Sequence, residues 1–207
     1  MTGAGTPKAA VFDFNGVVIT NTDLETFRAA AQARGVWFPL FLARYCLHNC
    51  AHITGKLDSF SFWSKVLAAE KPLTREEYER LLVQPYLRNT FIREVGELVA
   101  ALRRRGVKCV LLTNTSEYQV AANRALKRYV GFDALVLSNE AHCMKPFPSA
   151  FRLALQTAQA APSETVFVDD SWYNVWMARL LGFKAVAYCS PGQLKTAIKS
   201  LCGPILD

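Results

Sequence analysis

Short apolar runs alternate with longer amphipathic stretches through most of this chain. Residues 10–12 and 165–168 are apolar, and each run leads directly into an acidic residue, Asp13 in the first case and Asp169 in the second. Runs of this length, bounded by turn residues, predict buried strands whose ends lie at one edge of a sheet. Open α/β sheets bind ligands at the carboxyl edge of their strands, so the two acids indicate a ligand site there.

From residue 91 onward, helical and strand-like patterns alternate. The spacing of apolar residues predicts helices over 91–105, 117–128, 148–159 and 174–181, and strands over 107–112, 134–137 and 185–188. Alternating elements of these lengths imply right-handed crossovers and a parallel sheet. We therefore expect an α/β protein with a doubly wound, Rossmann-like parallel sheet.

Residues 20–90 interrupt this alternation because they predict helices only. Helices are expected over 22–34, over 38–48 and from near Ser59, and Thr74 followed by Glu77 has the form of a capping box. Most aromatic residues of the segment should form its core, with a few facing the ligand site: Trp37, Phe38, Phe41, Tyr45, Phe60, Phe62 and Trp63. We predict a core of residues 1–19 and 91–207, with an all-helical cap of residues 20–90 inserted after the first strand.

Composition narrows the class of protein. The chain has 207 residues, 51% of them hydrophobic, and no apolar stretch approaches the ~20 residues that a membrane span needs. The first eight residues carry no apolar signal core, so we expect a cytoplasmic protein with no membrane partner. The six cysteines show no Cys-x-x-Cys pairing and are expected to be free thiols.

The formal net charge of +7 does not indicate nucleic-acid binding. Basic residues gather at 103–105 and 108, at the end of a predicted helix, where cations suit the helix dipole. They are not interleaved with aromatic residues along one face, so no nucleic-acid partner is expected, although a positive field would attract an anionic small molecule. The spacing of His48, His52 and His142 does not predict a zinc site.

Four segments together resemble the motifs of the haloacid dehalogenase-like (HAD) superfamily. They are Asp13-Phe14-Asn15-Gly16, Thr113 after an apolar strand, Lys145 before Pro146 and a helix, and Asp169-Asp170 after another strand. Each motif alone is weak, but the ordered set extends over most of the chain. The resemblance implies a HAD-type enzyme with a helical cap that closes over the site and selects the substrate.

The resemblance also implies a magnesium site. Asp13 would be the nucleophile that attacks phosphorus or carbon, and one of its oxygens would bind Mg²⁺. The backbone carbonyl of Asn15 and the carboxylate of Asp170 would complete the protein ligands, with Asp169 assisting. Adjacent carboxylates at a buried edge also call for a cation on electrostatic grounds, although a helix cap is the plainer role for Asp170.

The remaining motif residues would handle the anion. By the same resemblance, Thr113 would hydrogen-bond the transferring group, and Lys145 would neutralise it and keep Asp13 ionised. Four further residues are candidate substrate contacts, two beside the motifs and two in the cap: Asn114, Tyr173, Arg28 and Arg44.

Asn15 departs from the family's pattern. HAD phosphatases carry a second Asp at this position, whose carboxyl group protonates the leaving group and then activates water. Asn15 keeps the backbone ligand but cannot exchange a proton. Three explanations remain open: specialisation for other chemistry, a degenerate enzyme, or an Asp-to-Asn change introduced to trap substrate. The Asn-Gly dipeptide is also a turn signal in its own right.

The sequence therefore favours a Mg²⁺-dependent HAD-type enzyme that displaces a phosphate-like group from a small anionic molecule. Other displacement chemistry is the alternative, either dehalogenation or an elimination or ring closure, because it needs no second Asp. A non-catalytic HAD-fold binding protein is the third possibility. The acidic pair argues against dehalogenation, and Asp13 together with Lys145 argues against a scaffold. A monomer and a dimer, with or without a partner protein, are all compatible with the sequence.

Overall fold

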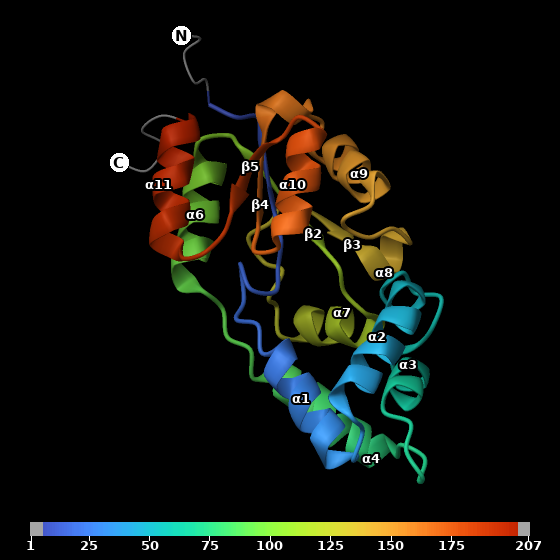
Figure 1. The fold of residues 1–207 in the computed structure, drawn as a ribbon. Coiled ribbons are helices and arrows are strands. Elements are labelled where there is room, and N and C mark those ends of the chain that lie inside the picture. The colour runs from blue at the N-terminus through green and yellow to red at the C-terminus, as the bar shows by residue number, and fades with distance from the viewer. Residues whose placement is uncertain (1–5, 203–207) are drawn as a thin grey trace.

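The computed structural model describes residues 6–202 and has a five-stranded parallel sheet at its centre (Figure 1). The strands are β1 (Ala9–Phe12), β2 (Lys108–Thr113), β3 (Ala134–Leu137), β4 (Thr165–Asp169) and β5 (Lys184–Ala187). Their order across the sheet is β3-β2-β1-β4-β5, and every pairing is parallel. The predicted doubly wound parallel sheet is confirmed, with the chain reversing its winding direction at β1.

Helices cover both faces of the sheet, because its central strands are apolar on both sides (Figure 1). One face packs against α6 (Arg93–Arg104) and α11 (Pro191–Cys202), and the other against α9 (Pro148–Ala158) and α10 (Trp172–Leu180). The helix α7 (Glu117–Ala125) lies beyond the end of the sheet, toward the helical segment (Figure 1). Along β1 the side chains alternate, since Ala10 and Phe12 join the first cluster while Ala9 and Val11 join the second. Parallel strands buried on both faces have continuous apolar sequences, as this chain does.

The segment between β1 and α6 is helical and has a hydrophobic core of its own. Its elements are α1 (Asp23–Ala33), α2 (Phe38–Ile53), α3 (Ser59–Val66), α4 (Arg75–Tyr78), the π-helix η1 (Glu79–Val83) and α5 (Gln84–Leu87). Phe41, Phe62 and Trp63 are buried at its centre. The predicted capping box is present, because the Thr74 hydroxyl accepts from the Glu77 amide at 3.1 Å and the Glu77 carboxylate accepts from the Thr74 amide at 3.1 Å.

The chain enters and leaves this helical segment through two loops, which lie side by side. The amide of Thr20 donates to the Thr90 carbonyl at 2.9 Å, and the amide of Thr90 donates to the Thr20 hydroxyl at 2.9 Å. The Asn89 side chain accepts hydrogen bonds from the hydroxyls of Thr20 and Thr22. The expected division into a core and a cap of residues 20–90 remains a prediction, and these paired loops are where its hinge would lie.

The helices also contact the α/β part directly. The buried hydroxyl of Ser138, at the start of α8 (Ser138–Ala141), donates to the Ile53 carbonyl at 2.6 Å and accepts from the Thr115 amide at 2.8 Å. Glu117, at the start of α7, accepts a hydrogen bond from the Ser59 amide. These contacts fix the end of α2 and the start of α3 beside the carboxyl edge of the sheet.

Several elements differ from the sequence predictions. The helix expected over 38–48 continues to Ile53, and α11 was not predicted although Leu194 and Ile198 bury one of its faces. The short 3₁₀ turn η2 (Pro162–Glu164) was also not predicted. Trp37, expected among the core aromatics, is 74% exposed.

The cysteines and the lengths of the helices bear on two expectations drawn from composition. Among the described side chains, Cys46, Cys50, Cys109, Cys143 and Cys189 are free thiols, whereas the side chain of Cys202 lies outside them. Within residues 6–202, no helix combines the length and the apolar character that a membrane span would require.

Candidate active site

A buried lysine joins two carboxylates at the carboxyl edge of the sheet. Asp13 follows β1 and Asp169 ends β4, so the two acids leave neighbouring strands. Lys145 Nζ lies 2.7 Å from Asp13 Oδ1 and 2.6 Å from Asp169 Oδ2. The side chain of Lys145 is only 1% exposed, so these two ion pairs replace the water that its ammonium group would otherwise bind.

Asp169 is fully committed to contacts within the protein. Its Oδ1 accepts hydrogen bonds from the Ser171 amide at 2.9 Å and from Asn174 Nδ2 at 3.0 Å. Its Oδ2 accepts a hydrogen bond from Lys145 Nζ at 2.6 Å. Asn174 occupies the place where the resemblance leads one to expect another acid, and it serves as a donor to Asp169. The arrangement indicates that Asp169 positions Lys145 more directly than it serves a metal.

Asp170 has a different environment, set by the turn after Asp13. Gly16 has φ of +84°, and a Cβ at this position would clash with Asp170 Oδ2. Only glycine both adopts this conformation readily and leaves room for the carboxylate. The Asn15-Gly16 turn therefore brings the backbone after β1 against Asp170.

Three carboxylates meet at this point. One oxygen from each of Asp13, Asp169 and Asp170 can be chosen so that all three lie within 4.8 Å of one another. Against them stands one ammonium group, that of Lys145, which leaves two negative charges uncompensated. Oxygen donors with this excess charge suit one divalent cation such as Mg²⁺.

The pKa values at the site reflect burial. Burial raises the pKa of the Asp13 carboxyl to about 7, and the charges of Asp169 and Asp170 add to this effect while Lys145 opposes it. Burial followed by the Asp169 charge raises the pKa of Asp170. Burial alone would lower the pKa of Lys145, but Asp13 and Asp169 outweigh it and raise that pKa. A cation at the carboxylates would favour their ionised forms.

Thr113 and Asn114 lie at the end of β2, beside these acids. The buried Thr113 makes only a weak contact, from its hydroxyl to the Asn114 carbonyl at 3.4 Å, so this hydroxyl can reorient toward a ligand. Asn114 was predicted to contact substrate. Its side chain binds both backbone groups of Lys145, donating to the carbonyl at 2.9 Å and accepting from the amide at 2.9 Å, and Asn114 also lines the cavity described below. Asn114 therefore holds Lys145 in position.

Asn15 lies in the turn after Asp13, as the sequence predicts. Its backbone forms an isolated bridge with Ile19, and its Oδ1 atom is buried without a hydrogen-bond partner among the described residues. An unpaired buried acceptor carries a free-energy cost, which a donor on a ligand would remove. The side chain cannot act as an acid or a base.

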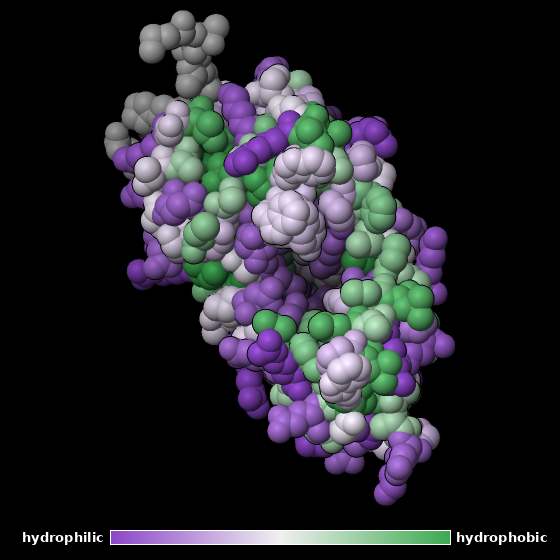
Figure 2. Space-filling model, viewed as in Figure 1, coloured by the Kyte–Doolittle hydropathy of each residue, from purple (hydrophilic) through white to green (hydrophobic). Residues whose placement is uncertain are grey.

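These residues line a cavity of about 290 Å³ between the sheet edge and the helical segment. Figure 2 shows the hollow between the two parts of the molecule. The motif residues in its wall are Asp13, Asn15, Thr113, Asn114, Lys145, Asp170 and Asn174, joined by Ser171 and Tyr173. Asp169 is buried behind them. Tyr173 thus lies where a substrate contact was predicted, whereas its neighbour Trp172 is 75% exposed and is not part of the wall.

The two arginines of the helical segment that were predicted to contact substrate lie elsewhere. Arg28 stacks its guanidinium 5.5 Å from the centre of the Phe38 ring, and Arg44 donates to the Ala68 carbonyl at 2.8 Å. Neither lines the cavity. The sequence suggested them because a cation in the cap would suit an anionic substrate, but periodicity alone does not show which face of a helix they occupy.

The helical segment contributes other residues to the wall. Tyr45 and Trp63 belong to the aromatic set of which a few members were expected to face the site. The remaining wall residues were not predicted as site residues: Asn21, Asp23, Phe27, Asn49, His52 and Ile53 from the helical segment, and Tyr118 and Gln119 from α7. Tyr45, Asn49 and His52 recur at helical spacing on α2, and this polar stripe was the available signal in the sequence. A weaker signal was Asp23, an acid at the start of the first helix after β1.

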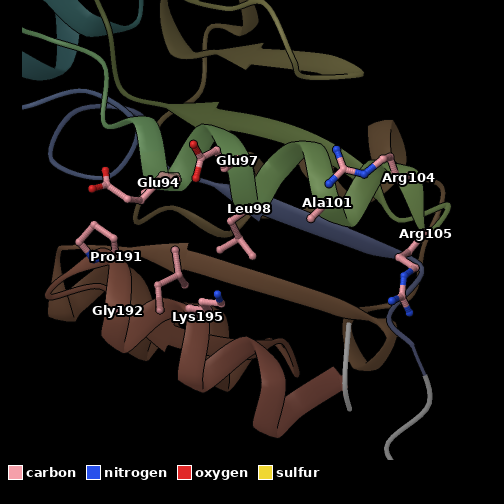
Figure 3. A pocket seen from close by; sticks show the side chains of 11 residues that line it. Glu94, Glu97, Leu98, Ala101, Arg104, Arg105, Pro191, Gly192 and Lys195 are labelled. Carbon is pink, nitrogen blue, oxygen red and sulfur yellow. The ribbon is translucent and has the colours of Figure 1, made fainter. Parts of the chain in front are cut away.

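Another cavity, of about 470 Å³, lies between α6 and α11 (Figure 3). Glu94 and Glu97 stand at one end and Arg104 and Arg105 at the other, with Lys195 on α11. None of the motif residues lines it. The chemistry implied by the sequence is therefore concentrated at the sheet edge.

The chain belongs to the haloacid dehalogenase-like hydrolases. The model of that family matches residues 7–182, which contain all four motifs at the sheet edge. The protein is thus a HAD-like hydrolase by family, and the predicted membership is confirmed.

Individual relatives are distant. Phosphorylated carbohydrates phosphatase from Thermotoga maritima is 24% identical over 193 residues, which cover 86% of this chain and 83% of that protein. Bifunctional epoxide hydrolase 2 from Rattus norvegicus is 24% identical over 199 residues, and the match takes in 36% of its length. The chain therefore spans about a third of that relative.

Among solved structures, a HAD family enzyme from Bacteroides thetaiotaomicron in complex with magnesium and inorganic phosphate superposes with a TM-score of 0.70. The two proteins are 19% identical, and the match covers 88% of this chain and 94% of the other. At this identity the likeness establishes the shared fold.

The buried His52 yields a prediction about pH. Burial lowers the pKa of His52 to about 4, compared with about 6.5 for an unfolded chain. The folded state binds this proton less tightly, so its stability is intact above about pH 6.5 and falls as the pH drops toward 4. Between about pH 7 and pH 4.5, His52 should account for roughly 2 kcal/mol of lost unfolding free energy.

Urea denaturation at several pH values measures this loss. His52→Gln should lose less stability on acidification than the unmodified chain, whatever its stability at neutral pH. His48→Gln, on the same helix but outside the cavity wall, is the control. Identical pH dependence in the unmodified chain and His52→Gln would contradict the prediction.

Proposed function

We propose that this protein is a Mg²⁺-dependent HAD-type enzyme that displaces a phosphate-like group from a small molecule, with Asp13 as the nucleophile. The observation that carries the proposal is the charge arrangement at the sheet edge. Three carboxylates share a space of a few ångströms with a single buried lysine. Such a set has little purpose as a structural feature, since burying its uncompensated negative charge is costly unless a cation completes it.

The residues present fit a divalent cation. Asp13 and Asp170 offer carboxylate oxygens. The backbone carbonyl of Asn15 belongs to the turn in which Gly16 lies against Asp170. These three groups are hard oxygen donors, which Mg²⁺ prefers. When bound, Mg²⁺ would neutralise the carboxylates and withdraw charge from the anionic group of the substrate. The Bacteroides relative, crystallised with magnesium and phosphate, supports this assignment.

The remaining residues would act on the substrate directly. An oxygen of Asp13 forms a bond to phosphorus while the bond to the leaving oxygen breaks, which gives an aspartyl phosphate. The Lys145 ammonium, 2.7 Å from Asp13, keeps the carboxylate ionised and is close enough to balance the incoming anion. The Thr113 hydroxyl would donate to an oxygen of the transferring group.

Asn15 restricts the reaction that follows. A poor leaving group must be protonated as it departs, and the aspartyl phosphate turns over only if a base deprotonates water. Asn15 can donate a hydrogen bond but supplies neither proton transfer. The unmodified chain should therefore hydrolyse ordinary phosphate monoesters slowly.

Other displacement chemistry is the second candidate, and Asn15 is the observation that favours it. An elimination or ring closure that expels an anion needs a hydrogen-bond donor at this position more than a relaying acid. The same Asp13, Lys145 and cation would serve it. Dehalogenation is less compatible, because Asp170 would have no function in it.

The first test is Asn15→Asp. The added carboxyl group should raise kcat/KM for a phosphate monoester by about 10²–10⁴-fold, because general acid–base assistance is worth that much. Phosphate release from a panel of phosphorylated metabolites, with Asp13→Asn as the inactive control, measures the gain. Efficient turnover by the unmodified chain with no gain in the variant would show that another residue relays the proton. If neither form hydrolysed any ester, the second candidate would be favoured.

Metal binding gives an independent test. Asp170→Asn should weaken Mg²⁺ binding, measured by calorimetry, by at least about tenfold, because it removes one of two charged ligands. Glu70→Gln, an exposed acid outside the cavity, is the matched control for the change in net charge. Equal Mg²⁺ affinity in the unmodified chain and in Asp170→Asn would refute the assigned ligand set.

A further inference from the structure

We propose that the substrate carries a protonated amine on the part that does not react, and that Asp23 binds this ammonium group within a wall of aromatic rings. The proposal rests on the function proposed above and names the class of molecule that the same cavity selects. Charge, aromatic rings and unpaired polar atoms are distributed over the cavity wall in a way that suits such a molecule.

Asp23 is an acid without a cation. It is the first residue of α1 and lines the cavity that contains Asp13 and Lys145. Burial, followed by the charge of Asp170, raises the pKa of Asp23 to about 6, so the group is still mostly ionised at neutral pH. Among the described residues, no lysine or arginine forms an ion pair with it.

The charge balance of the reacting centre does not include Asp23. One divalent cation and Lys145 would together neutralise Asp13, Asp169 and Asp170. The Asp23 carboxylate is then left as a further negative charge in the cavity wall, outside this cluster of three acids. A cationic group on the substrate would remove the cost of burying it.

Cations are available in the cap but do not reach the cavity. Residues 20–90 contain nine lysines and arginines, and none of them lines it. Arg28 and Arg44 are held as described above, and Arg34 pairs with Glu77 at 3.0 Å. His52 does line the cavity, but burial lowers its pKa to about 4 and leaves the ring neutral. The wall therefore offers no second anion site.

Aromatic rings line the same cavity as Asp23. The centre of the Phe27 ring lies 5.3 Å from that of Tyr45 and 5.1 Å from that of Trp63, and all three residues line the cavity with Tyr118. The faces of such rings attract ammonium groups. A carboxylate beside several rings is thus a combination that favours an organic cation over a neutral or anionic group.

Unpaired polar atoms in the same wall point to a ligand with hydrogen-bond donors. The Oδ1 atom of Asn49 is buried and has no partner among the described residues, and the same is true of Trp63 Nε1. Asn49 Oδ1 can accept from an N–H of an ammonium group, and the indole N–H can donate to an ester or hydroxyl oxygen.

A purely structural role for Asp23 does not account for these observations. An acid in the first turn of a helix is favoured by the helix dipole, and Glu25 supplies one from an exposed position in the same turn. That role does not require a half-buried carboxylate in the wall of the cavity that also holds Asp170 and the rings.

The test compares three small phosphate esters of similar length whose far ends differ in charge. They are O-phosphoethanolamine, which ends in an ammonium group, n-propyl phosphate, which is neutral, and 2-phosphoglycolate, which ends in a carboxylate. Calorimetric affinities in the presence of Mg²⁺ are measured for the unmodified chain, for Asp23→Asn and for the control Glu25→Gln. Hydrolysis of the same esters is followed in parallel with Asn15→Asp.

The unmodified chain should bind the ammonium ester at least about tenfold more tightly than the neutral one, and the carboxylate ester most weakly. Asp23→Asn should remove that preference by weakening the first ester about tenfold, with little change for the second and tighter binding of the third. Glu25→Gln should retain the original order.

An equal loss of affinity for all three esters in Asp23→Asn would overturn the proposal, and so would tighter binding of the carboxylate ester by the unmodified chain. Failure of the proposed function has a different signature. In that case none of the esters would be hydrolysed by Asn15→Asp, whatever the order of their affinities.

Discussion

The contact between Lys145 and the two acids beside it is the interaction on which the site depends. An ammonium group that is 1% exposed can remain charged only if anions replace its water, and Asp13 and Asp169 do so at 2.7 and 2.6 Å. Removing one partner from such a buried set typically costs about 3–5 kcal/mol. The acids must therefore leave adjacent strands, which places β1 beside β4 in the sheet.

Much of the surrounding structure serves this contact. Asn114 holds the backbone of Lys145 from β2, and Asn174 and the Ser171 amide hold Asp169 from the start of α10. Because Asp169 is held in this way, Asp170 is the member of the acidic pair that faces the cavity, beside Asp13. The four motifs thus meet at one place for three structural reasons. They are the order of the strands, the turn at Gly16, and the hydrogen bonds of Asn114 and Asn174.

The sequence predicted the parts of the molecule that local patterns determine. Apolar runs that end in acids predicted β1 and β4, and the motif order predicted that Asp13, Thr113, Lys145 and the acidic pair would meet at one edge. Two predicted contacts failed for a common reason, because the direction in which Arg28 and Arg44 point depends on packing between α1, α2 and α3. The same packing brings Asp23 and Asn49 to the cavity, and no local pattern encodes it.

The direct test of the central claim is whether Asp13 becomes phosphorylated. With p-nitrophenyl phosphate the leaving group departs without protonation, so the first step does not need an acid, whereas release of phosphate still needs the base that Asn15 cannot supply. With Asp13 as the nucleophile, we expect a rapid burst of about one p-nitrophenolate per protein, slow turnover afterwards, and a phosphoryl group on the peptide containing Asp13 in acid-quenched samples examined by mass spectrometry. A burst-free reaction at a steady rate, with no phosphoryl group on Asp13, would contradict it.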